Sequence, residues 1–190
     1  YWLLRQNILN QEKKLQPDWS LSSTEIMSES KCIIKDEELN LSDKVIVASS
    51  FTAKSLSLLN KKKQLNIKII PYGIDLPKTK IINSRKVNEK FKIFFAGRPT
   101  ISKGIHYLIK SLSQLDFPWE VEIAGSIPEK PVEISKKLHS FFKDDRCKFL
   151  GQISNKDVLK KMQNSHVFLF PSLFEGFGQV ILESLSSSLP

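Results

Sequence analysis

The chain has 190 residues, 41% of them hydrophobic and 26% charged, a balance that excludes a disordered or fibrous protein. Its 29 lysines and arginines exceed its 20 aspartates and glutamates, and the resulting net charge of +9 favours an anionic partner: a phosphorylated small molecule, nucleic acid or an acidic membrane surface. No stretch approaches the ~18–20 apolar residues of a membrane span. Cys32 and Cys147 have neither Cys-x-x-Cys spacing nor the density of a disulfide framework, so we expect a reducing compartment.

The two ends of the sequence are unusual. It opens on Tyr1 without a methionine, a basic segment or an apolar leader, and it stops at Pro190 directly after a helical pattern. We therefore interpret the chain as an internal piece of a longer protein.

Short runs rich in Val, Ile, Phe and Leu recur along the chain, and most of them lack polar alternation. They are residues 44–48, 67–70, 91–96, 119–124, 147–150 and 167–170. Dense apolar runs of this length are typical of strands buried on both faces of a parallel sheet.

Segments with helical periodicity separate these runs. Helices are predicted over 21–41 and 51–59 and from starts near Lys103, Pro131, Ser154 and Gly178. Ser154 with Asp157 three residues later forms a capping box. Alternating strands and helices predict βαβ units, right-handed crossovers and a doubly wound α/β fold with a parallel sheet covered on both faces.

A domain boundary is predicted between residues 71 and 90. There the sequence PYGID supplies proline and glycine turn signals, apolar periodicity lapses, and basic residues outnumber acidic ones. We place a linker at 75–90, between one domain that ends within 1–74 and a second domain over 91–190.

The first candidate site lies where the strand predicted at 91–96 ends. That strand exits through Gly97-Arg98, and Lys103-Gly104 opens the next helix. In open α/β sheets ligands bind at the carboxyl ends of the strands, where a helix N-terminus presents free N–H groups to an anion. Taken alone, Arg98 and Lys103 fit solvated surface charges better than a binding site, because most lysines and arginines are solvated.

The second candidate site is the segment FPSLFEGFGQVILE at 170–183, where a buried strand ends in a glycine-containing loop and a helix follows. Gly176 and Gly178 would let the backbone approach a ligand closely. Glu175 before the helix and Glu183 within it suit hydroxyl recognition, because a carboxylate accepts from two sugar or ribose hydroxyls at once.

Simpler interpretations of the two carboxylates stay open. Glu175 would complement the helix dipole and Glu183 would face solvent, although apolar Ile181, Leu182 and Leu185 lead us to expect part of its surroundings to be enclosed. A hydrolase pair is disfavoured, since eight residues of helix separate the carboxylates by ~12 Å.

Together these segments resemble the group 1 (family 4) glycosyltransferases of the GT-B fold. Glu175 and Glu183 match the E-x7-E signature, and FFAGRPTISKGIHYLIKSL is similar to the strand, Gly-Arg, Lys-Gly and helix segment of that family. EVEIAG and CKFLGQISNKDVLKKMQNSHVFLFPS follow in the family's order, while LSDKVIVASSFTAKSL and IIPYGID resemble the crossing from the acceptor-side to the donor-side domain. The resemblance covers about residues 37–190.

The resemblance implies a retaining transfer from a nucleotide-diphosphate sugar to a glycan, a lipid-linked or another hydroxyl acceptor. Arg98 and Lys103 would hold the diphosphate and neutralise the leaving phosphate, Glu183 would accept from the ribose hydroxyls, and Glu175 would hold the sugar hydroxyls. The implied catalytic residues are Arg98, Lys103 and Glu175, and the implied donor-binding residues are Gly97, Arg98, Lys103, Glu175, Gly176, Phe177, Gly178 and Glu183.

The resemblance also implies features around the reaction. GT-B members commonly work without a metal, so neither a metal nor a cofactor is expected, and the linker would act as the hinge of domain closure. We expect a cytoplasmic location, at or near the inner membrane surface, with peripheral membrane contact and no nucleic-acid partner.

The sequence departs from the family at one turn and lacks some of its parts. Ser188 stands where the family usually has a glycine, two residues before the proline. The glycine-rich loop and the histidine of the acceptor domain would lie before Tyr1. His106, His139 and His166 match no functional position, and we interpret them as structural or surface residues.

Two other classes of function compete with this interpretation. One is a basic anion-binding module, in which Lys61-Lys62-Lys63 and the basic linker would contact nucleic acid or lipid, although no aromatic-interleaved binding sheet accompanies them. The other is a non-catalytic relative that keeps the GT-B fold.

Overall fold

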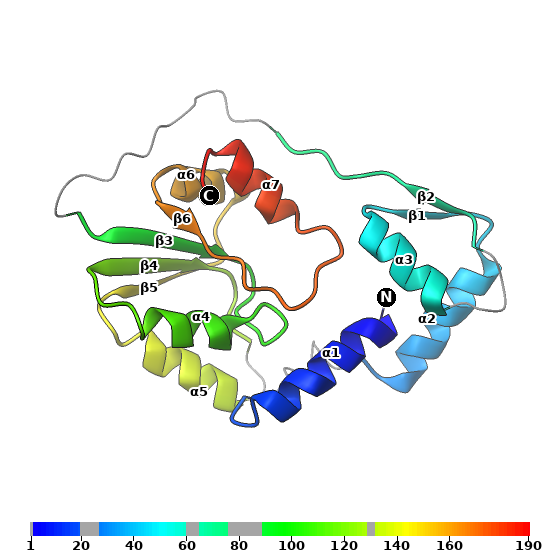
Figure 1. Cartoon of the computed structure of the whole chain (residues 1–190), viewed down its shortest axis with the longest axis horizontal. Helices are drawn as coiled ribbons and strands as arrows, with labels where there is room; N and C mark the ends of the chain where they lie inside the picture. Colours follow the sequence, from blue (N-terminus) through cyan, green and yellow to red (C-terminus); the bar gives the residue numbers. More distant parts are fainter. Residues whose placement is uncertain (1, 20–26, 60–64, 76–88, 129–131) are drawn as a thin grey trace.

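Two separate parallel sheets organise the chain in the computed structural model, which describes residues 2–19, 27–59, 65–75, 89–128 and 132–190. The smaller sheet pairs β1 (Val45–Val47) with β2 (Ile67–Ile69). The larger sheet has the order β5-β4-β3-β6. Figure 1 shows the two sheets at opposite ends of the molecule, with α1 lying between them.

The smaller sheet is covered by helices α2 (Glu29–Leu41) and α3 (Ser50–Leu59). Ser28 caps α2, since its hydroxyl accepts from the Lys31 N–H, so the helix begins at Glu29 and not at residue 21 as predicted. Residues 20–26 lie outside the described residues. A small core of Trp2, Val47 and Leu56 joins this sheet to α1 (Trp2–Leu15), a helix that the sequence analysis did not predict.

The larger sheet confirms the predicted parallel α/β fold. Its strands are β3 (Phe91–Ala96), β4 (Trp119–Ala124), β5 (Cys147–Gly151) and β6 (Val167–Phe168), and every neighbouring pair is parallel. Helices α4 (Ile105–Leu112) and α5 (Val132–Phe141) cover one face, while α6 (Asn155–Gln163) and α7 (Gln179–Ser186) lie on the other (Figure 1). Ser154 caps α6 as predicted, accepting from the Asp157 N–H at 3.2 Å.

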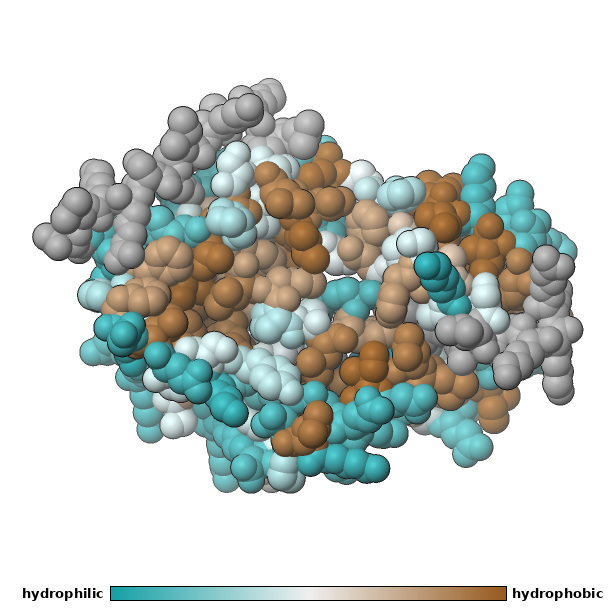
Figure 2. All heavy atoms as spheres, in the orientation of Figure 1, coloured by the Kyte–Doolittle hydropathy of each residue, from teal (hydrophilic) through white to brown (hydrophobic). Residues whose placement is uncertain are grey.

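The main core lies between the larger sheet and helices α4 and α5. Ile93 and Phe95 of β3 and Val121 and Ile123 of β4 point into it, and all four are almost fully buried. A second cluster around Phe94 lies beneath α6. In Figure 2 hydrophobic residues gather over the larger sheet and over the smaller sheet's half of the molecule.

The prediction that the strands are buried on both faces is wrong for the amino-terminal part of β3 and β4. Lys92, Glu120 and Glu122 lie on the α6 side of the sheet and are only half-buried. There Lys161 of α6 binds Glu122 at 2.8 Å, so an ion pair stands where apolar packing was expected.

The predicted linker lies mostly outside the described residues, which resume at residue 89. Residues 71–75, which precede it, have no regular secondary structure. The domain limits at residues 74 and 90 remain a prediction.

Candidate functional site

The carboxyl ends of β3, β4 and β5 meet at one edge of the larger sheet. The Gly97 N–H donates to the Ala124 carbonyl at 2.9 Å, and the Gly125 N–H donates to the Gly151 carbonyl at 2.8 Å. A Cβ atom on Gly125 would lie 2.1 Å from the Gly97 carbonyl oxygen, so only glycine allows these two strand ends to approach so closely. This is the edge at which open parallel sheets bind ligands.

At this edge the start of α4 is joined to the loop of residues 171–178 that precedes α7. The Leu173 N–H donates to the Ser102 carbonyl at 2.9 Å. Gly104 has φ +67°, and a Cβ there would lie 2.0 Å from the Pro171 carbonyl oxygen. The Lys103-Gly104 turn therefore lies directly against the 171–178 loop.

This packing brings Lys103 and Glu175 together, although 72 residues separate them in the sequence. The Lys103 ammonium forms an ion pair with the Oε1 atom of Glu175, and the Ser172 hydroxyl donates to the same atom at 3.1 Å. The ammonium also lies 5.6 Å from the centroid of the Phe170 ring. Both charged side chains remain partly exposed, so a ligand can reach them.

Arg98 stands apart from this cluster. Its side chain is exposed, and its guanidinium forms no ion pair with the residues that the structure describes. It follows Gly97 at the end of β3, and the Thr100 N–H donates to its carbonyl at 2.8 Å, which turns the loop toward Lys103. The structure thus places Arg98 at the predicted edge without bringing it into contact with Glu175.

Glu183 occupies a different place in the site. It lies in the second turn of α7, where the Asn155 side-chain amide donates to its Oε1 atom at 3.0 Å. It helps to line a hollow of about 380 Å³, together with Gly73, Ile74, Asp75, Asn155, Leu159 and Gln179. Gly73, Ile74 and Asp75 of the PYGID segment therefore line the same hollow as the α7 carboxylate.

The prediction that Ile181, Leu182 and Leu185 enclose part of the surroundings of Glu183 is wrong for two of these three residues. Ile181 is 38% exposed and Leu185 is 63% exposed. They lie one turn apart on the same outward stripe of α7, over which Figure 2 shows hydrophobic side chains at the surface. Glu183 is half-buried because of Asn155 and the residues of the hollow.

The middle of the 171–178 loop contacts the smaller sheet's half of the molecule. The Gly176 carbonyl accepts from the hydroxyls of Ser49 and Thr52, which come from the start of α3. The Phe177 ring lies edge-on to Tyr72, with 5.4 Å between ring centroids. Gly178, with φ +67°, then begins α7 as its N-cap.

Sequence reasoning missed several polar neighbours of the predicted residues: Ser49, Thr52, Ser172 and Asn155. Ser49 is a residue type favoured at the N-cap, and this signal indicates the beginning of α3. It does not reveal that the same hydroxyls reach a loop more than 120 residues away.

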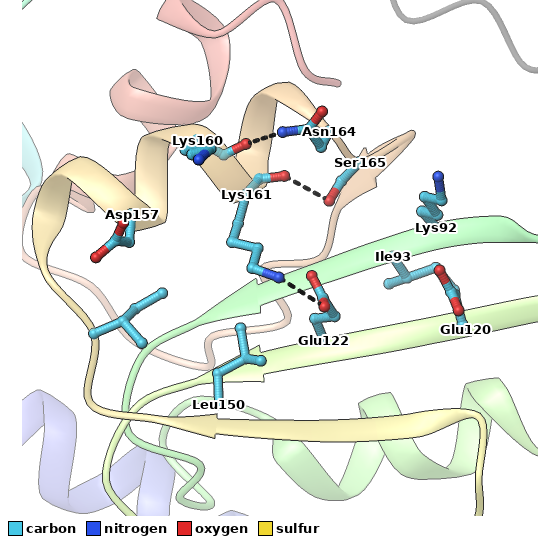
Figure 3. Close-up of a pocket in the computed structure, with 11 residues that line it drawn as sticks. Lys92, Ile93, Glu120, Glu122, Leu150, Asp157, Lys160, Lys161, Asn164 and Ser165 are labelled. Carbon is cyan, nitrogen blue, oxygen red and sulfur yellow. Dashed lines mark hydrogen bonds and ion pairs between the residues drawn. The ribbon is translucent and has the colours of Figure 1, made fainter.

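A second hollow, of about 520 Å³, lies beneath α6 on the amino-terminal halves of β3 and β4 (Figure 3). Two of its ammonium groups have carboxylate partners: Lys161 binds Glu122 at 2.8 Å, and Lys92 binds Glu89 at 2.6 Å. Leu150 and Ile153 line one side of the hollow near the carboxyl end of β5, but Lys103, Glu175 and Glu183 do not line it, so we do not assign it to the site.

The histidines and cysteines lie away from this edge or take structural roles. His106 is buried against Glu12, with 2.9 Å between Nε2 and Oε1, and the Nδ1 atom of His166 accepts from the Lys92 N–H at 2.8 Å. Cys32 and Cys147 are free thiols, and burial raises the pKa of Cys147 to about 12. Among the described helices none is both long and apolar enough to span a membrane.

Comparison with known proteins identifies the family. The sequence model of the family described as "Glycosyl transferases group 1" matches residues 77–190, which is more than half of the chain. The chain belongs to this family. The match includes Gly97, Arg98, Lys103 and both carboxylates, and the resemblance seen in the sequence is confirmed.

Curated proteins named as glycosyltransferases are also similar to this chain in sequence. The uncharacterized glycosyltransferase YqgM of Bacillus subtilis (strain 168) is 29% identical over 151 residues, which are 77% of this chain and 40% of that protein. The phosphatidylinositol N-acetylglucosaminyltransferase gpi3 subunit of Schizosaccharomyces pombe is 27% identical over 136 residues, 70% of this chain and 29% of that protein. The chain thus spans less than half the length of these curated relatives.

Solved structures of glycosyltransferases share the fold. The structure of Anabaena Alr3699/HepE in complex with UDP and glucose superimposes with a TM-score of 0.71 at 22% identity, over 90% of this chain and 50% of that one. The likeness extends over both sheets, since it covers nine-tenths of the chain, and it confirms the GT-B fold.

Proposed function

We propose that the protein to which this chain belongs is a retaining glycosyltransferase, which moves a sugar from a nucleotide-diphosphate sugar to a hydroxyl group of a glycan or a lipid-linked acceptor. The observation that carries this proposal is the contact of Lys103, Ser172 and Glu175 at the carboxyl edge, beside the N-terminus of α7. Family membership and the names of the relatives support it.

Lys103 and Arg98 would serve the diphosphate. In the transfer the bond between the sugar's anomeric carbon and the phosphate oxygen breaks, and negative charge develops on the leaving nucleoside diphosphate. The free N–H groups at the start of α7 and the two cations would stabilise that charge. The acceptor oxygen bonds to the anomeric carbon on the same face of the sugar, and its proton passes to the leaving phosphate.

Glu175 would bind the hydroxyls of the donor sugar. Its Oε1 atom is already fixed by Ser172 and Lys103, so the carboxylate has a defined orientation before the donor arrives. When the diphosphate binds, Lys103 would share its protons between the phosphate and Glu175. Phe177 and Gly176 would lie against the sugar through the loop backbone.

Glu183 would bind the ribose. It lines the hollow of about 380 Å³ next to Gly73 and Asp75, and a carboxylate in such a place can accept from both ribose hydroxyls. Asn155, which donates to the same carboxylate, would hold its orientation. The base would then lie near residues 151–153 at the end of β5.

We further propose that the enzyme needs no metal, because cationic side chains and a helix N-terminus provide the charge that a metal would supply. A cytoplasmic location at the inner membrane surface completes the proposal. The net charge of +9 and a relative whose name contains phosphatidylinositol support an acceptor carried by an anionic membrane.

The test is nucleoside diphosphate binding to the full-length protein. UDP, GDP and ADP are each titrated while thermal unfolding is followed, and at 100 times its Kd the cognate nucleotide should stabilise the fold by about 2.7 kcal/mol.

Glu183→Gln should raise the Kd of the free nucleoside diphosphate roughly tenfold by removing a charged acceptor. Glu175→Gln should leave that Kd unchanged and lower kcat, because this nucleotide contains the ribose but no sugar.

Glu120→Gln is the matched control, since Glu120 is a half-buried carboxylate on the α6 side of β4, away from the carboxyl edge. It should change neither Kd nor kcat. Equal losses in Glu175→Gln and Glu183→Gln would reject the division of roles. Nucleotide binding without transfer to any of a set of acceptor mixtures would favour the non-catalytic relative, and equal binding of polyphosphate and nucleotide would favour a basic anion-binding module. Transfer that EDTA abolishes would reject the proposal that no metal is needed.

A further inference from the structure

The start of α3 contacts the 171–178 loop through two hydroxyl groups. The Ser49 hydroxyl accepts from the Thr52 N–H at 3.1 Å and so caps α3. The Ser49 hydroxyl lies within hydrogen-bond reach of two acceptors, the Gly176 carbonyl and the Thr52 Oγ1 atom at 3.1 Å, and the Thr52 hydroxyl donates to the Gly176 carbonyl at 3.1 Å. A carbonyl oxygen has two lone pairs, so both donors can be satisfied at once. We call Ser49, Thr52 and the Gly176 carbonyl the hydroxyl clasp.

Aromatic contacts lie on both sides of the hydroxyl clasp. The rings of Phe51 and Phe174 meet edge to face with 5.6 Å between centroids, and those of Tyr72 and Phe177 with 5.4 Å. Phe174 and Phe177 flank Glu175 and Gly176 in the sequence. In Figure 1 the loop before α7 extends away from the larger sheet toward α3.

Two adjacent residues of the 171–178 loop, Glu175 and Gly176, are therefore held by different parts of the molecule. Glu175 is bound by Lys103 from the larger sheet's half and by Ser172 of the loop itself. The next residue, Gly176, is bound by Ser49 and Thr52 from the smaller sheet's half. Because Glu175 and Gly176 are adjacent, a shift of the Gly176 carbonyl also shifts the carboxylate of Glu175.

We propose that Ser49 and Thr52 are positioning residues, which fix the Gly176 carbonyl and thereby hold the Glu175 carboxylate in its productive place. The proposal deepens the proposed function and rests on it. Ser49 and Thr52 act through the loop backbone and not on the donor itself. Losing them should therefore impair the orientation of the reacting sugar more than the binding of the nucleotide.

The experiment uses two substitutions in the full-length protein that remove the clasp without uncapping α3. Thr52→Val replaces the hydroxyl by a methyl group of similar size. Ser49→Asp keeps a side-chain acceptor for the Thr52 N–H but has no proton to donate to the Gly176 carbonyl. Each should lower kcat about tenfold while the Kd for the nucleoside diphosphate stays within twofold, because the lost hydrogen bond orients and does not bind.

Three further variants separate the clasp from general damage to α3. Thr52→Ser and Ser49→Thr keep a hydroxyl and should restore kcat to within about threefold of the unsubstituted protein. Ser57→Ala is the matched control: Ser57 is an exposed residue of α3 whose hydroxyl donates only to its own helix, at the Ala53 carbonyl. It should leave kcat and Kd unchanged.

Hydrogen exchange gives a readout that does not depend on activity. In Thr52→Val and Ser49→Asp, the amides of residues 174–178 should exchange at least about fivefold faster, whereas those of β3 should not change. Unchanged loop exchange together with unchanged kcat would overturn the proposal, as would an equal rise of Kd and fall of kcat. If the unsubstituted protein binds no nucleoside diphosphate, the proposed function fails, and loop exchange alone still decides whether the hydroxyls hold the loop.

Discussion

Ser188 ends α7 in a conformation that favours glycine. Its φ is 56°, and among the described residues other than glycine no further one has a positive φ. The Ser188 N–H donates to the Leu185 carbonyl and the Leu189 N–H to the Ser184 carbonyl, both at 3.0 Å, which is the Schellman arrangement. The turn sends Leu189 into the core, where it is 1% exposed. The turn thus forms without the glycine that is usual in the family.

Ser188→Gly should therefore stabilise the protein. Glycine reaches a positive φ without steric cost, and after its larger loss of chain entropy is counted, the free energy of unfolding should rise by up to about 1 kcal/mol. Urea denaturation measures this as a higher midpoint with an unchanged slope. Ser57→Gly, in the helical backbone of α3, should show the opposite sign, and a loss of stability in Ser188→Gly would contradict the account.

Cys147 should be unreactive in the folded protein. It is buried in the main core, and burial raises its pKa to about 12 from the ordinary 9.0, which leaves very little thiolate at pH 8. Iodoacetamide at pH 8 followed by peptide mass spectrometry should modify the partly exposed Cys32 and spare Cys147 until urea is added. The pKa of Cys147 is higher in the folded chain than in the unfolded chain. This thiol therefore leaves the free energy of unfolding unchanged below pH 9 and lowers it as the pH rises from 9 toward 12. Equal labelling of both cysteines would contradict this assignment.

Between elements, α1 connects the two halves through a buried polar contact. Trp2 at its start belongs to the small core, while Glu12 near its end is buried against His106 of α4 at 2.9 Å. A hydrogen bond to Glu12 is also the main cause that raises the pKa of Tyr107 above 10.0. Beyond α1, Trp19 packs near His106 with 5.8 Å between ring centroids.

Glu12→Ala should loosen α1 from α4. It leaves the buried imidazole of His106 without its carboxylate, which costs about 1–3 kcal/mol of unfolding free energy. NMR titration should show the pKa of Tyr107 falling back toward 10.0, since the hydrogen bond to Glu12 is the main interaction that raises it. The control is Gln11→Ala, an exposed neighbour on the same helix, which should change neither quantity. An unchanged Tyr107 pKa in Glu12→Ala would show that the contact does not form in solution.

The contact between Glu12 and His106 also explains why the sequence did not predict helix α1. The strands and helices of residues 91–190 follow from dense apolar runs, capping residues and glycines, which are local signals. The buried residues of α1 include a glutamate, so its inward face does not have an apolar pattern. The partner of that glutamate is 94 residues away, and no local pattern indicates it.

The candidate site, too, could be predicted from the sequence only in part. The residue types and their positions at strand ends were predictable, because parallel strands share a carboxyl edge. Which side chains meet there was not, since Lys103 and Glu175 come together only because Gly104 allows the backbone to touch Pro171. The exposure of Ile181 and Leu185 could not be predicted either, because the presence of an apolar residue on a helix does not show whether a neighbouring element covers it.

For the whole molecule, the two halves differ in how much core they contain. The core beneath α4 and α5 contains fully buried Phe95, Ile123 and Leu138, whereas the buried members of the small core are Trp2, Val47 and Leu56. In native-state hydrogen exchange of the 190-residue chain, the amides of β1 and β2 should exchange through an opening of lower free energy than those of β3 and β4. Equal protection of both sheets would show that the chain unfolds as a single unit.

The Gly176 contact has a consequence for how the sequence of the 171–178 loop can change. Ser49 and Thr52 recognise a main-chain oxygen, which every residue type at position 176 would present. The rings of Phe174 and Phe177, in contrast, contact Phe51 and Tyr72 through their side chains. The attachment of the loop to the α3 side therefore has one part that follows the loop sequence and one part that does not, and a variant that lost both rings would keep only the two hydroxyl contacts.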